Sequence, residues 1–286
     1  MSNPWDDLSV VADPDVPNRF RATISDKWTL AVVPQGGIVT AIAVEAMAAA
    51  LGDPTQTLRT QTSVYAGQVF AGDVDIDVTV LRRGRSMSQL SATVTNPGSP
   101  AGLTVVAVFG APRKGFDFLD LTPPDVPGPD GLRSYRDPIP DGIDFEFAFP
   151  RMAFWEEIVE TRPATGRAPW EPFEPGPSDV VNWFRFDDPP TDDDGLLHPA
   201  APLVVCDTMP GSVGQKVGPS DPPWFGPSAD YTVHSLGRTE PGWLLGHLRA
   251  RAGADGYASV EMTLWPEDLS HPVAYATQVM FFSFVR

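Results

Sequence analysis

A carboxylate interrupts an apolar segment at residues 202–209, which reads PLVVCDTM. This carboxylate belongs to Asp207, and Val204, Val205 and Cys206 directly precede it. An unpaired carboxylate among apolar side chains costs several kcal/mol, so we expect it to meet polar partners. A water held by such a group becomes a nucleophile with a general base beside it. Asp207 is therefore the first candidate for chemistry, with a helix-capping or helix-dipole role as the alternative.

Two further polar side chains could be partners of Asp207. Gln278 lies in the apolar segment AYATQVMFF, where an unpaired amide is costly, and a bond to a neighbouring strand is its structural alternative. Ser228 follows Pro227 and could instead stabilise a turn. Alternation along a strand puts Ser228, Asp230 and Thr232 on one face, so Thr232 is an alternative hydroxyl.

An apolar helix is predicted over residues 36–51. Gly36 and Gly37 allow another backbone to approach its start, Ala and Ile fill its body on almost every side, and Gly52 ends it. Such a helix must be wrapped by other elements. Alternating segments follow at residues 60–65, 73–82, 86–95 and 103–111, which predicts four antiparallel strands around this helix.

The same pattern returns in the second half of the chain. Residues 112–141 are rich in Pro, Asp and Gly and are typical of a linker. A strand is predicted at 180–186, a helix from near Pro199, and strands at 230–236, 243–251, 257–265 and 273–285. The pattern predicts an α+β protein with two antiparallel sheets, each wrapped around a central apolar helix. We expect domains at 1–118 and 150–286, joined by a linker at 119–149.

Composition argues against several classes of protein. The 286 residues include 20 basic and 37 acidic side chains, a net charge of −17 that disfavours general nucleic-acid binding. The single cysteine, Cys206, excludes an intrachain disulfide. The longest apolar run is too short to span a bilayer, and the acidic start does not resemble a signal peptide. We expect a cytoplasmic protein that does not bind membranes.

Three motifs associated with other sites do not fit. GPSAD at 226–230 approaches the nucleophile turn of α/β-hydrolases, but its last residue is Asp and a strand follows. GSVGQKVG at 211–218 matches neither common nucleotide-binding spacing. No metal-ligand spacing occurs among the histidines, so neither a metal nor another cofactor is expected: His198, His234, His247 and His271.

Segments in both halves carry a family resemblance. In the first half they are RFRATI (19–24), PQGGIVTAIAVEAM (34–47), VTVLRRGRSMSQLSATVTNPG (78–98) and VAVFGAPRKGF (106–116). In the second half they are NWFRF (182–186), the helix with Asp207, PSADYTVH (227–234) and AYATQVMFF (274–282). They resemble the acyl-CoA thioesterase II (TesB-like) family of double hot-dog proteins. The resemblance implies hydrolysis of acyl-CoA by a water that Asp207, Ser228 and Gln278 hold and activate.

Two groups in the first half acquire expected roles from this resemblance. The N–H groups of Gly36 and Gly37, at the positive end of the first helix, could stabilise the thioester oxygen as it becomes negative. Close packing of helix on sheet is the alternative for both glycines. Arg82, Arg83 and Arg85 could contact the phosphates of CoA, although a solvated hairpin tip explains them equally well.

Two other functions stay open for a chain of this kind. A non-catalytic acyl-CoA or acyl-chain binding protein would keep the groove without the chemistry. A dehydratase or hydratase of enoyl thioesters is less similar, because neither helix has the Asp and His pair at its start that those enzymes use. The acyl chain length cannot be predicted, and a chain with two hot-dog units could act alone or pair edge to edge as a homo-oligomer.

Overall fold

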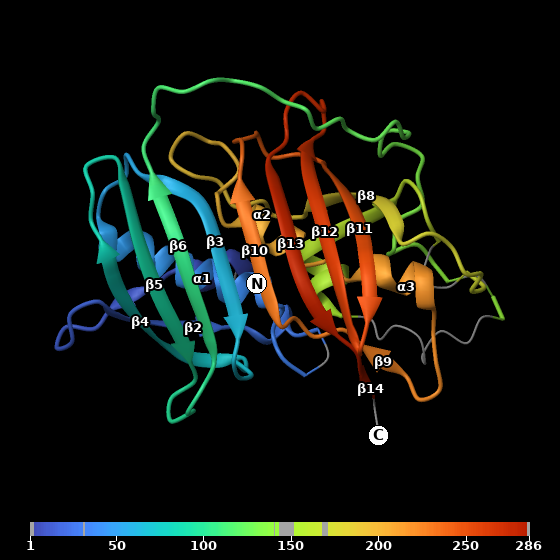
Figure 1. The fold of residues 1–286 in the computed structure, drawn as a ribbon. Helices are drawn as coiled ribbons and strands as arrows, with labels where there is room; N and C mark the ends of the chain where they lie inside the picture. Colours follow the sequence, from blue (N-terminus) through green and yellow to red (C-terminus); the bar gives the residue numbers. More distant parts are fainter. Residues whose placement is uncertain (1–2, 31, 140, 143–151, 168–170, 285–286) are drawn as a thin grey trace.

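One antiparallel sheet dominates the computed structural model, which describes residues 3–30, 32–139, 141–142, 152–167 and 171–284 (Figure 1). Its twelve strands run in the order β1-β2-β4-β5-β6-β3-β10-β13-β12-β11-β8-β7. The α+β class is confirmed, but the prediction of two separate sheets is wrong. The edge strands β3 and β10 pair directly, so the two expected sheets become one.

The first half surrounds helix α1 with five strands rather than the four predicted. β2 precedes the helix and pairs with β4, completing the order β2-β4-β5-β6-β3. The elements are β1 (Val11–Ala12), β2 (Arg19–Ile24), α1 (Gly36–Leu51), β3 (Thr57–Tyr65), β4 (Gly72–Arg82), β5 (Met87–Thr95) and β6 (Leu103–Gly110). Two 3₁₀ turns accompany them, Pro4–Leu8 and Asp26–Trp28.

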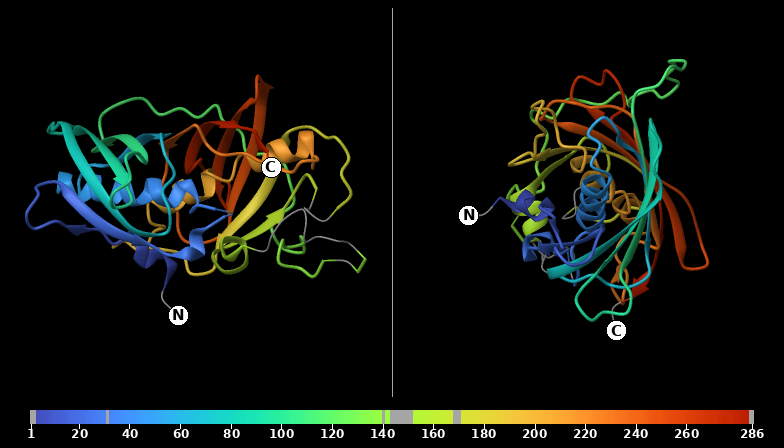
Figure 2. Two further views of the ribbon diagram at one scale, coloured as in Figure 1. Left: turned by 90° about the horizontal axis from the view of Figure 1, so that it is seen from below. Right: turned by 90° about the vertical axis from the view of Figure 1, so that its left-hand side faces the viewer.

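Helix α1 is the buried axis of this half. The right-hand view of Figure 2 looks along the helix, which lies inside the curve of the sheet. Its end is fixed twice: Gly52 adopts a left-handed conformation with φ of 60°, and the Arg83 guanidinium donates to the carbonyls of Leu51 (2.8 Å) and Ala50 (3.1 Å). A cation at this end also complements the negative pole of the helix.

The second half repeats the arrangement with a broken helix. Its elements are a π-helical turn (Phe154–Ile158), β7 (Val159–Pro163), β8 (Asp179–Phe186), α2 (Ala201–Cys206), α3 (Gly211–Val217), β9 (Trp224–Phe225), β10 (Asp230–Ser235), β11 (Leu244–Ala254), β12 (Tyr257–Pro266), β13 (Ala274–Phe281) and β14 (Ser283–Phe284). As the position of Pro210 in the sequence predicts, this helix is shorter than the apolar segment at 202–209. Pro210 has no N–H for the carbonyl of Cys206, so α2 ends at Cys206 and Asp207 follows as its C-cap. In the described part of the chain, no helix is long and apolar enough to cross a membrane.

The Pro-rich segment after β6 packs on the second half. Its described residues form no helix or strand, and Figure 1 shows the segment crossing above the sheet. Trp183 Nε1 donates to the carbonyl of Pro127 (2.9 Å), while Val126 and Leu132 pack against a cluster that contains Trp183 and Trp243. The segment therefore covers apolar side chains of the second half. Residues 140 and 143–149 of the predicted linker lie outside the described part.

The pairing of β3 with β10 relates the two halves. Thr62 faces Thr232 at its centre, and their hydroxyl oxygens lie 2.9 Å apart. Outward from this pair, β3, β6, β5, β4 and β2 on one side match β10, β13, β12, β11 and β8 on the other. The fold is thus an approximate duplication about a two-fold axis through this seam.

Candidate active site

Asp207 lies where the end of α2 meets the start of α1. Gly37 donates its backbone N–H to Asp207 Oδ2 at 2.9 Å. A side chain at Gly37 could not be accommodated, since a Cβ there would lie 2.5 Å from the carbonyl oxygen of Leu203. The close approach predicted for this glycine is confirmed. The hydrogen bond, however, occupies the N–H that the sequence analysis assigned to the thioester oxygen.

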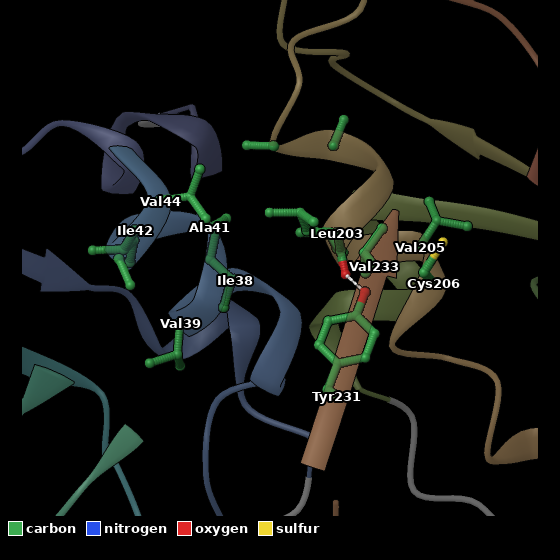
Figure 3. Close-up of a cluster of buried hydrophobic side chains, with 14 of the residues drawn as sticks. Ile38, Val39, Ala41, Ile42, Val44, Leu203, Val205, Cys206, Tyr231 and Val233 are labelled. Carbon is green, nitrogen blue, oxygen red and sulfur yellow. Dashed lines mark hydrogen bonds between the residues drawn. The ribbon is translucent and has the colours of Figure 1, made fainter. Parts of the chain in front are cut away.

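Two side chains that the sequence analysis overlooked hold α1 and α2 together. Gln35, the N-cap of α1, donates its Nε2 to the carbonyl of Val204 at 2.6 Å. Tyr231 reaches from β10 and donates its hydroxyl to the carbonyl of Leu203, also at 2.6 Å (Figure 3). Strand alternation marks Tyr231 as an inward-facing neighbour of Thr232, whereas no pattern in the sequence distinguishes Gln35.

The environment of Asp207 favours the protonated carboxyl group. Although the residue as a whole is partly exposed, its Oδ1 is buried and has no hydrogen-bond partner among the described residues. Burial raises the pKa of Asp207 to about 7, and hydrogen bonds from Gly37, Gly36 and Ser228 oppose this rise. A carboxyl with this pKa can both accept and return a proton near neutral pH.

Gln278 and Ser228 meet on the inner side of the sheet. Gln278 is only 2% exposed, and its Nε2 donates to Ser228 Oγ. Its Oε1 is buried and receives no hydrogen bond in the described part of the chain. Because Ser228 also interacts with the Asp207 carboxylate, the structure brings the three predicted residues together.

A β-bulge separates Ser228 from Thr232. Thr232 pairs with Thr277, and Ser228 pairs with Met280, so four steps along one strand oppose three along the other. The extra residue reverses the alternation, because a bulge turns the following side chain to the other face. Ser228 therefore faces Gln278, while Thr232 faces outward to Thr62. The prediction that Ser228 and Thr232 share one face is wrong.

The three arginines lie far from Asp207. They occupy the β4–β5 hairpin at the C-terminal end of α1, and a helix of this length separates its two ends by roughly 22 Å. Arg83 caps the helix, which gives it a structural role. Arg82 and Arg85 are exposed and form no ion pair with any described residue.

Comparison with known families identifies the chain. Residues 24–110 match the model of the acyl-CoA thioesterase N-terminal domain, and residues 124–282 match that of the C-terminal domain. The chain belongs to the acyl-CoA thioesterase family. This thioesterase has no match among curated proteins.

Solved structures confirm the hot-dog fold of the thioesterase. A protein of unknown function with a hot-dog fold from Alicyclobacillus acidocaldarius is 23% identical, with a TM-score of 0.77 and 100% coverage of both chains. An acyl-CoA thioesterase II from Mycobacterium marinum is 19% identical, with a TM-score of 0.73 and 99% coverage of both chains. At these identities the likeness concerns the fold.

Proposed function

We propose that this thioesterase hydrolyses acyl-CoA to a free fatty acid and CoA, with Asp207 as the general base. One observation carries the proposal: a buried carboxylate with a pKa of about 7 faces the start of α1 beside Ser228 and Gln278. The family supplies the acyl-CoA substrate class. In this proposal Gly36 and Gly37 orient the carboxylate.

Two buried oxygens indicate how a water would bind. Asp207 Oδ1 and Gln278 Oε1 are acceptors without a donor among the described residues. Buried acceptors of this kind are nearly always satisfied, and one water has two protons to donate. Ser228 Oγ, which accepts from Gln278 and interacts with Asp207, would fix the spacing between them.

The reaction then proceeds without a covalent enzyme intermediate. Asp207 takes one proton from the water as its oxygen attacks the thioester carbonyl carbon, and the carbonyl oxygen becomes negative. The tetrahedral intermediate collapses, the carbon–sulfur bond breaks, and the proton on Asp207 passes to the leaving sulfur. The products are the carboxylic acid and the thiol of CoA.

Replacing Asp207 by Asn tests the base directly. We expect kcat/KM for thiol release to fall by about 10³ or more, because the amide cannot accept the proton. Asp193→Asn, the same change at an exposed site, is the matched control. Melting temperature and binding of a non-hydrolysable acyl-CoA analogue establish that the fold and substrate binding persist. Retained turnover in Asp207→Asn would overturn the proposed base.

The coenzyme part of the substrate has its own test. We propose that Arg82 and Arg85 contact the phosphates, since both cations are exposed and free of ion pairs with described residues. Arg82→Gln combined with Arg85→Gln should raise KM for acyl-CoA severalfold. An acyl-N-acetylcysteamine thioester, which has no phosphates, is the control and should keep its KM. Equal effects on both substrates would contradict the phosphate contact.

A further inference from the structure

Tyr65 is a side chain near Asp207 that the reaction above does not use. It ends β3, and its hydroxyl lies over the first residue of α1. A Cβ at Gly36 would be 2.5 Å from this hydroxyl, so only glycine leaves room for it. The adjacent residue, Gly37, donates to Asp207. The phenol thus reaches the same helix terminus as the carboxylate.

A chain of hydroxyl groups orients the Tyr65 hydroxyl. Ser63 Oγ donates to Gln61 Oε1 at 2.9 Å, and Thr40 Oγ1 lies 2.9 Å from Ser63 Oγ. Each hydroxyl has one proton. Since Ser63 gives its proton to Gln61, Thr40 must give its own to Ser63. Tyr65 is then the donor toward Thr40, from which it is separated by 3.5 Å, the limit of a hydrogen bond.

The opposite amide orientation leads to the same result. Gln61 Nε2 is buried without a partner among the described residues, and a half-turn of the amide would exchange it with Oε1. If Nε2 donates to Ser63, then Ser63 donates to Thr40 and Thr40 donates to Tyr65. The Tyr65 proton is then wholly uncommitted. In either arrangement Tyr65 has an O–H without a strong acceptor.

The surroundings also keep this phenol protonated. Burial, followed by the negative charge of Asp207, raises the pKa of Tyr65 well above its ordinary value. The hydroxyl can therefore serve as a donor at every pH at which Asp207 acts as a base. The backbone N–H of Gly37, by contrast, already has Asp207 Oδ2 as its acceptor.

We infer that the Tyr65 hydroxyl is a catalytic hydrogen-bond donor to the thioester carbonyl oxygen, with Thr40, Ser63 and Gln61 as its positioning residues. This role rests on the proposed thioester hydrolysis, in which that oxygen becomes negative. A donor that is fixed before the reaction stabilises the negative charge without reorganising. The positive pole of α1 beneath Gly36 adds to the stabilisation.

Tyr65→Phe removes the donor and keeps the ring. We expect kcat for acyl-CoA hydrolysis to fall by about 10²–10³, as for loss of one oxyanion donor, while KM stays within about twofold. The pH at which kcat/KM is half-maximal should not move, because Asp207 still sets it. Tyr275→Phe is the matched control, since the Tyr275 hydroxyl donates to Glu261 on the outer face of the sheet.

Thr40→Val tests the positioning chain. It should lower kcat about tenfold alone, yet add little to Tyr65→Phe, because Thr40 acts through the phenol. If the two substitutions lower kcat independently, so that their factors multiply in the double variant, this chain is contradicted. Unchanged or increased kcat in Tyr65→Phe would overturn the donor role, an increase meaning that the phenol obstructs the substrate. Activity in Asp207→Asn would refute the general base. The same assay of Tyr65→Phe tests the donor separately, so failure of one role can be distinguished from failure of the other.

Discussion

The two halves share an architecture but differ at every position of the proposed site. Aligning the helix starts places Ile42 of α1 opposite Asp207, and aligning the strands about the Thr62–Thr232 pair places Leu58 opposite Ser228 and Ala107 opposite Gln278. These three counterparts are 0%, 5% and 1% exposed. One half has a polar site where the other has apolar core.

The backbone around these positions is nevertheless the same. β3 has a bulge between Leu58 and Thr60, which matches the bulge that turns Ser228 inward. The position in the second half that corresponds to Gly37 is Pro202, which has no N–H to donate to a carboxylate. The fold alone therefore does not create the site. A few side chains, and one missing N–H, decide which of two similar places can perform chemistry.

The largest predicted effect on stability comes from placing a carboxylate at the position of the first half that corresponds to Asp207. Ile42→Asp would bury a charge where Pro202 cannot donate and no polar residue corresponds to Gln278. We expect the free energy of unfolding to fall by more than about 3 kcal/mol. Urea denaturation measures this free energy. Ile42→Val is the control and should lower it by about 1 kcal/mol. A well-tolerated Asp would show that the two places are more alike than their residues indicate.

The second prediction separates two buried carboxyl groups by pH. Burial raises the pKa of both Asp207 and Glu45 to about 7. Each folded-state pKa is above the unfolded value, so each group stabilises the fold most below about pH 4, and this contribution is lost as the pH rises through 7. Asp207→Asn and Glu45→Gln should each flatten this decline in urea-denaturation measurements.

Activity should distinguish the same two carboxyl groups. We expect kcat/KM to fall about tenfold per pH unit below 7, because Asp207 must be ionised to accept a proton. Glu45→Gln should leave that pH profile unchanged, because Glu45 lies on the body of α1, away from the helix start that Asp207 contacts. Its ionisable neighbour is His198, whose Nε2 lies 3.9 Å from Glu45 Oε1. A shifted profile in Glu45→Gln would show that Glu45 affects the ionisation of Asp207.

The third prediction concerns the helix ends. Arg83→Met removes two hydrogen bonds to the end of α1 and should cost about 1 kcal/mol of stability. Turnover should persist, because the site is at the other end of the helix. Arg82→Met, one residue away without these bonds, is the control for stability. A drop in kcat for Arg83→Met would show that the two ends of α1 are coupled.

The smallest predicted effect is at the seam itself. Thr232→Val removes a hydroxyl contact on the exposed face and should change stability by less than about 1 kcal/mol. Turnover should remain within about twofold in thiol-release assays. Ser228→Ala, on the inner face, should lower kcat/KM by about tenfold or more. Comparable losses in both variants would mean that the bulge does not separate their roles.

Regular periodicity predicted the elements well. The helix at 36–51 has its predicted bounds and ends at Gly52, and each of the nine predicted strands lies within a few residues of an observed one. Periodicity failed where a local irregularity decides the geometry. Pro210 marks the break in the second helix, but nothing in the sequence marks the bulge before β10, which turns Ser228 to the face opposite Thr232.

The candidate site was predictable only in part. Asp207, Ser228 and Gln278 came from the family resemblance and from the cost of burying polar groups, and the structure brings them together. Gln35, Tyr65 and Tyr231 were missed, because their importance depends on contacts between α1, α2 and the seam. Such contacts join residues more than a hundred positions apart or across separate strands, which no local pattern records.

The covalent connection between the halves has a consequence for evolution. Two identical chains related by a two-fold axis must carry the same residue at both matching positions, so each substitution is made twice. In this single chain Gly37 and Pro202 occupy such positions and are free to differ. The first-half position therefore keeps the N–H that holds Asp207, while the second-half position carries the proline of the first turn of α2.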